Sequence, residues 1–115
     1  MTGQWEHELA QQVETILTTV DPPAETVVAD LLWAMEYHGG RVAFYVLCSF
    51  DEQGRRTEQA ENALANWEAV NSLRLAELAA GPWGKAVSLA RVLRDLLRTE
   101  QAHVDRLDAE TRSTP

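Results

Sequence analysis

The sequence predicts an all-α fold of four or five helices that ends in a long antiparallel helical hairpin. Apolar residues recur at spacings of three and four along most of the chain, which is the pattern of helices with one buried face. The segment Gly81-Pro82-Trp83-Gly84 separates the last two of these stretches. Glycine suits a left-handed helix cap and proline cannot continue the preceding hydrogen bonds, so we expect the hairpin helices to span about 58–80 and 85–109.

The first two helices are predicted on either side of Asp21-Pro22-Pro23. The first covers about residues 4–20, and the second is expected to end at Gly39-Gly40. Residues 41–50 are apolar nearly all round, which fits a buried helix or a buried strand. We interpret them as a buried helix, because a single strand has no partner in an otherwise helical chain unless a second copy supplies one. Cys48 lies in this run and is expected to be a buried, unreactive thiol.

The last two helices complete a single domain over residues 1–115. Thr57 can cap the helix over about 58–80. The helix over about 85–109 carries a heptad-like apolar seam in which position 100 is missing, and its inward residues are Ala86, Ala90, Leu93, Leu97, Val104 and Leu107. Residues 109–115 are polar, so we expect a frayed tail.

Charge and composition restrict the partners and the setting. The formal net charge of −8 argues against a nucleic-acid backbone, because such binding depends on Lys and Arg displacing counterions, and it favours basic protein partners. Cys48 is the only cysteine, so no intrachain disulfide forms. The first residues resemble no signal peptide, and the most apolar run, 42–50, is shorter than the ~20 residues of a membrane helix. We therefore expect a cytoplasmic protein with no membrane contact.

No arrangement of residues indicates catalysis. Ser49, Ser72 and Ser88 lack the glycine-flanked context of a nucleophilic serine, and the chain has no Gly-rich phosphate loop and no pair of closely spaced cysteines. We favour a non-enzymatic role and expect no cofactor, although the absence of motifs leaves an enzyme possible in principle.

Excess apolar width on two helices predicts contact with another protein. Trp33 lies well off the inward row of the second helix, and Leu73 and Leu75 straddle the inward row of the helix over 58–80. With Trp83 at the corner, these residues are the predicted interface. We expect a small acidic helical interaction module that self-associates, docks on a protein partner, or both. Assembly factors and acidic inhibitors of basic effectors, of the immunity or antitoxin type, fit this description equally.

A metal-binding bundle is the first alternative. Glu100 interrupts the apolar seam and His103 follows three residues later, which is the Glu-x-x-His spacing of helical di-metal carboxylate sites. Such sites need a second set of ligands, so this one would be completed across a dimer, with Glu36 as a further ligand. A metal ion is expected only under this alternative.

Two further patterns concern anions and nucleic acid. Arg91, Arg94 and Arg98 form a basic strip that could pair with nearby carboxylates or bind an anion or acidic partner. Residues 34–42 resemble the opening of bacterial helix-turn-helix segments, in which a helix ends at a glycine pair. The stretch in the place of the recognition helix, 44–48, is apolar instead of polar and basic. A degenerate nucleic-acid binder is therefore the second alternative.

Overall fold

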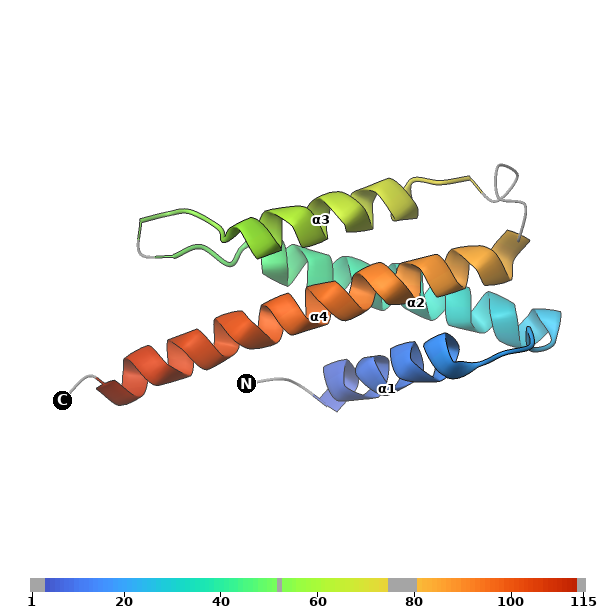
Figure 1. Ribbon diagram of the computed structural model, residues 1–115. Coiled ribbons are helices and arrows are strands. Elements are labelled where there is room, and N and C mark those ends of the chain that lie inside the picture. Colours follow the sequence, from blue (N-terminus) through green and yellow to red (C-terminus); the bar gives the residue numbers. More distant parts are fainter. Residues whose placement is uncertain (1–3, 52, 75–80, 114–115) are drawn as a thin grey trace.

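The computed structural model describes residues 4–51, 53–74 and 81–113, and within these ranges the chain forms four helices and no strand. The helices are α1 (Gln4–Thr18), α2 (Glu25–Leu47), α3 (Glu58–Asn71) and α4 (Gly81–Ser113). Each helix runs in the opposite direction to the one before it (Figure 1). The all-α prediction and the antiparallel pairing of the last two helices are therefore confirmed.

The helices are arranged around α4. It lies along α2, while α1 and α3 flank it on opposite sides (Figure 1). Within the described residues α1 and α3 do not touch each other, and α4 contacts all three other helices. The molecule is elongated, with principal extents of 54 × 25 × 19 Å. One side of α2 consequently packs on α4, and no described helix covers its opposite side.

The core lies where α2 and α4 meet. Met35 and Val42 of α2 are fully buried against a row of α4, and α1 and α3 each add one apolar face. The largest fully buried side chains are Leu9, Val13, Ile16, Met35, Val42, Val46, Leu89, Leu93 and Leu96. Beyond Thr99 the helix α4 leaves this core, and Leu107, predicted to face inward, is 46% exposed.

The prediction that Gly39-Gly40 ends the second helix is wrong, because α2 continues through both glycines to Leu47. Gly39 is buried, and a Cβ atom built on it would overlap the indole ring of Trp67 from α3. Glycine is needed here for close packing and not to break the helix. The packing of the Trp67 ring on the helix backbone stabilises the fold by more than the low helix propensity of glycine destabilises it.

Residues 41–47 are helical as predicted, but the segment is not buried all round and is not a separate helix. Val42 and Val46 face the core, whereas Phe44 and Leu47 are exposed. Cys48, expected to be buried, is also exposed. The error follows from the assumed break: once the helix is continuous, only one of its faces can reach the core.

Other boundaries also differ from those expected. α3 ends at Asn71 and not near 80, and residues 75–80 lie outside the described residues. Gly81 has the predicted left-handed backbone (φ 64°), yet it begins α4, so Pro82 lies in a first turn, where proline is tolerated. At the other end α4 continues to Ser113, so the tail predicted to fray from 109 is helical up to that residue. Thr57 caps α3 as predicted, its hydroxyl accepting a 3.1 Å hydrogen bond from the amide of Ala60.

Candidate interaction surface on α2

Helix α2 carries two apolar rows on different sides. The first row fills the core, and Val28, Leu32, Met35, Gly39, Val42 and Val46 are its buried members. The second row, called the outer row below, consists of Trp33, Tyr37, Gly40, Phe44 and Leu47, which follow one another in alternating steps of four and three. Its large side chains are exposed: Trp33 and Phe44 to 60%, Tyr37 to 55% and Leu47 to 46%. The outer row is thus a helix–helix contact pattern that faces solvent.

The outer row is preorganised at one end and open in the middle. The rings of Trp33 and Tyr37 stack, with centroids 5.0 Å apart and planes 5° from parallel. A Cβ atom at Gly40 would meet no described atom within 4 Å. Hollows of about 370 and 360 Å³ lie on either side of this glycine, both bordered by Phe44. A side chain from another molecule could therefore approach the helix backbone here.

The structure brings two of the four predicted interface residues into one groove. Trp33 and Trp83 both line an apolar groove of about 780 Å³ between the first half of α2 and the start of α4, together with Pro22, Pro23, Pro82 and Leu32. Leu73 follows the end of α3, is 36% exposed, and does not line this groove. Leu75 lies outside the described residues. The groove adjoins the outer row at Trp33.

Opposite charges flank the outer row. On one side Glu36 forms an ion pair with Lys85 (3.1 Å), whose ammonium group also donates to the carbonyl of Asn71 (3.3 Å). On the other side the guanidinium group of Arg41 lies 3.8 Å from the ring centroid of Trp5. Lys85 is buried, but the Glu36 side chain remains 41% exposed. Both flanking charges are therefore held in place by contacts within the chain.

The three predicted metal ligands are not brought together within one chain. Glu36 pairs with Lys85, whereas Glu100 faces α1, and Arg106 donates a 2.6 Å hydrogen bond to Nδ1 of His103. Burial and the neighbouring guanidinium group lower the pKa of His103. The residues that the structure describes contain no group of three or more His, Cys, Asp or Glu side chains able to hold a metal ion.

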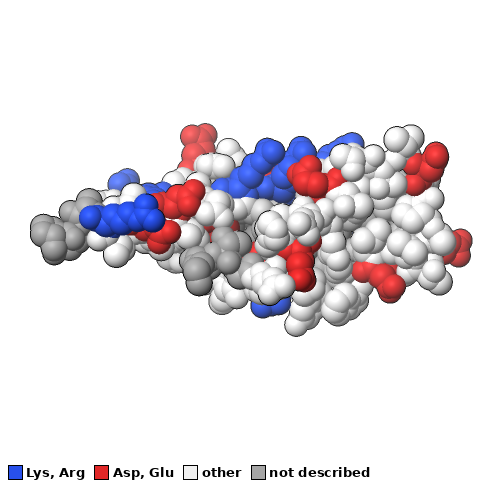
Figure 2. Space-filling view, turned by 90° about the horizontal axis from the view of Figure 1, so that it is seen from below, with Lys and Arg blue, Asp and Glu red and all other residues white. Residues whose placement is uncertain are grey.

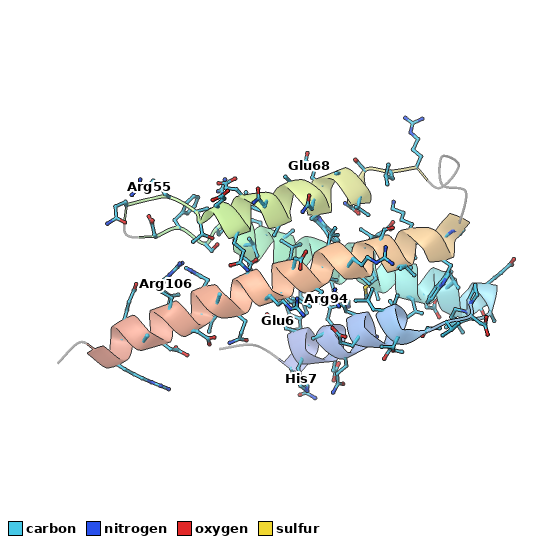
Figure 3. All side chains as sticks on the ribbon, viewed as in Figure 1. Glu6, His7, Arg55, Glu68, Arg94 and Arg106 are labelled. Carbon is cyan, nitrogen blue, oxygen red and sulfur yellow. The ribbon has the colours of Figure 1, made fainter. Side chains whose placement is uncertain are left out.

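Glu100 forms a carboxyl pair with Glu6, which is buried and lies between α1 and α4 (Figure 3). The exposed His7 lines a pocket between the same two helices. Burial raises the pKa of the Glu100 carboxyl from 4.5 to about 8, and the hydrogen bond with Glu6 and its negative charge act in the same direction. The folded state therefore keeps a proton that the unfolded chain loses above about pH 4.5. Folding stability should fall as pH rises from about 4.5 to 8.

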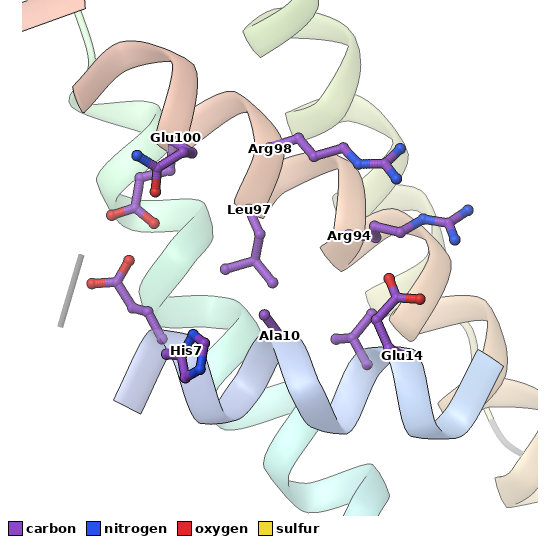
Figure 4. Close-up of a pocket in the computed structure, with 10 residues that line it drawn as sticks. His7, Ala10, Glu14, Arg94, Leu97, Arg98 and Glu100 are labelled. Carbon is purple, nitrogen blue, oxygen red and sulfur yellow. The ribbon is translucent and has the colours of Figure 1, made fainter. Parts of the chain in front are cut away.

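The arginine strip lies beside acidic groups. Arg94 and Arg98 border a pocket of about 300 Å³ between α1 and α4, which Glu14 and Glu100 also line, and Leu97 points into it (Figure 4). Arg91 and Arg98 are exposed, and the half-buried Arg94 has no hydrogen-bond partner for its Nε atom among the described residues. Viewed from the α1 side, basic side chains gather midway along the molecule with acidic ones next to them (Figure 2). The strip is thus part of a mixed-charge surface.

Sequence reasoning found Trp33 but missed the rest of the outer row. Tyr37, Phe44 and Leu47 were divided between a helix ending at Gly39-Gly40 and a separate buried helix. The alternating four- and three-residue steps from 33 to 47 were the available signal, and they become visible only when α2 is read as continuous through Gly40.

Comparison of the chain with family models, curated proteins and solved structures finds no match. Among the helices that the structure describes, none has the length and apolarity needed to cross a lipid bilayer. What the chain does must therefore be argued from its own surfaces.

Proposed function

We propose that the chain is a non-enzymatic protein-interaction module that uses the outer row of α2 to bind a helix of another polypeptide chain. One observation carries the proposal. Four large apolar side chains stand about half exposed, at helix-pairing intervals, on a helix whose opposite face already fills the core. The core does not need these side chains, and leaving them in contact with water has no benefit within a single chain.

The size of this surface supports the proposal. A fully exposed aromatic side chain presents roughly 150–250 Å², so the outer row exposes roughly 400 Å² of apolar surface. Contiguous apolar patches of this size on monomeric proteins are often binding sites. Trp and Tyr are also enriched among the residues that contribute most to binding, because they bury a large area at a small cost in conformational entropy.

Where the partner is a different protein and not a second copy, the charge of the chain favours a particular class. At a net charge of −8, long-range attraction favours proteins with basic residues around their apolar contact, and it disfavours nucleic acid. A cytoplasmic assembly factor, or an acidic inhibitor of a basic effector of the immunity or antitoxin type, would work in this way. In either role the groove lined by Trp33 and Trp83 extends the contact area beyond the outer row.

A matched pair of substitutions tests the proposal. Leu47→Glu places a charge in the outer row, and Leu107→Glu places the same charge on α4 at an equal starting exposure of 46%. Complexes of the full-length chain are recovered from cell extract and sized by light scattering. Circular dichroism verifies that both variants remain folded. We expect Leu47→Glu to abolish association and Leu107→Glu to leave it intact.

Phe44→Glu should abolish association as well, because losing a central aromatic anchor alone costs at least about 2 kcal/mol, or roughly 30-fold in affinity. If the two leucine variants and Phe44→Glu all associate like the original chain, whether with themselves or with another protein, the outer row is not a binding surface.

A further inference from the structure

We infer that the occupant of the outer row is a second copy of this chain, with the two α2 helices side by side, parallel and in register. This inference rests on the proposed function and adds the identity and direction of the partner helix. It follows from three properties of α2: its repeat, the position of its flanking charges and the open backbone at Gly40.

The repeat of the outer row is self-complementary. Steps of four, three, four and three residues correspond to the average period of 3.5 at which two helices stay in contact over several turns. The ideal partner for such a row is a helix with the same period. The five positions extend from Trp33 to Leu47, so two copies of α2 would remain in contact over about four turns.

The flanking charges select the parallel arrangement. Glu36 lies on one flank of the outer row and Arg41, five residues later, lies on the other. In a parallel helix pair these two positions face each other across the contact, so Glu36 of each copy meets Arg41 of the other. In an antiparallel pair each flank meets its own counterpart, which brings like charges together. The parallel pair therefore forms two equivalent ion pairs.

The middle of the row permits close approach. A Cβ atom at Gly40 would have no described neighbour within 4 Å, and hollows lie on both sides of this residue. In the parallel pair Gly40 faces Gly40 of the second copy, with Tyr37 and Phe44 on either side. Two outer rows would bury roughly 800 Å² of apolar surface. The flanking Glu36 and Arg41 side chains add to this area and bring it towards the ~1,000 Å² expected of a specific interface.

Cysteine cross-linking of the full-length chain tests both the partner and the direction. Cys48 is first replaced by serine, because its exposed thiol would otherwise cross-link. In that background Leu47→Cys introduces a thiol at one end of the outer row. This position faces its own counterpart only in a parallel pair, because in an antiparallel pair it would face Trp33 of the second copy. The matched control is Val27→Cys, which lies on another side of α2 and is 45% exposed. A disulfide needs Cα atoms within about 7 Å, which only directly facing residues satisfy.

We expect the unmodified chain to sediment as a dimer. We expect Leu47→Cys to cross-link rapidly under mild oxidation, while Val27→Cys stays largely without a cross-link. A dimer in which Leu47→Cys does not cross-link would overturn the parallel register. A chain that sediments as a monomer at high concentration would overturn the inference entirely. In that case a complex with a different protein, lost in Leu47→Glu and kept in Leu107→Glu, would still support the proposed function.

Discussion

Replacing Gly39 by alanine tests how α3 is docked on α2. In the structure the indole of Trp67 occupies the space that a side chain at position 39 would fill. The ring is only 6% exposed, so it contributes much of the apolar area that α3 buries. An added methyl group forces this ring outward. The adjacent Gly40→Ala is the matched control, because the same methyl group there enters open space within one chain. Both variants are made in a Leu47→Glu background, which disrupts the proposed contact of Gly40 with a second copy.

The two substitutions should change stability in opposite directions. Alanine is favoured over glycine within a helix by about 1 kcal/mol, so Gly40→Ala should stabilise the fold by about that amount. Gly39→Ala has the same propensity gain, but if the indole retreats and exposes ~100 Å² the fold loses about 2.5 kcal/mol at ~25 cal/mol per Å². We therefore expect Gly39→Ala to be about 1–2 kcal/mol less stable than the chain with Leu47→Glu alone.

Urea unfolding followed by circular dichroism measures both variants, at equal protein concentration because association would shift the apparent stability. The difference between them should be about 2–3 kcal/mol. In a Trp67→Leu background, where the ring is gone, Gly39→Ala should become neutral or stabilising. Equal stability of the two alanine variants would show that the contact between Trp67 and the α2 backbone does not hold α3 in place.

Three further substitutions test other contacts. Glu100→Gln removes the carboxyl whose raised pKa destabilises the fold as pH rises from about 4.5 to 8. We expect a gain in stability of about 1–3 kcal/mol at pH 8, reduced by solvent screening because the group is half-buried, and little change at pH 4.5. A pH-independent effect in urea titrations would argue against the carboxyl pair. Lys85→Met keeps the buried part of the side chain but removes the ammonium group that pairs with Glu36. It should lower the free energy of unfolding by about 1 kcal/mol. Arg91→Met is the solvent-exposed control. Thr57→Ala removes the cap of α3 and should cost about 1 kcal/mol, whereas Thr57→Ser should restore it.

Periodicity was sufficient for the fold class because α1 and α4 are strongly amphipathic. Leu9, Val13 and Ile16 share one face of α1 and are buried as their spacing predicts. The glycines were the difficult positions. Gly39 is buried within a helix, and Gly81 begins one. Whether a glycine ends a helix or lets another helix pack closely depends on the segment beside it, which for Gly39 is Trp67 of α3. Such information is tertiary and is absent from local sequence.

The candidate site could also be predicted in part from helical periodicity. Trp33 stood out because it lies off the inward row, and the structure places it with Trp83 as a shared lining of one groove. Glu100 was identified as an anomaly in an apolar seam, and the structure places it beside Glu6, from the other end of the chain. Pairings between residues so distant in sequence follow from the packing of α1 on α4, which no local pattern encodes.

The central position of α4 has a consequence for how the protein is made. α1, α2 and α3 emerge from the ribosome before α4 does, and in the described structure α1 and α3 share no contact. The apolar faces of α1 and α3 have little surface to pack on until α4 emerges. Stable folding during synthesis is therefore delayed until α4 has emerged, and until then the apolar faces of the earlier helices are open to aggregation.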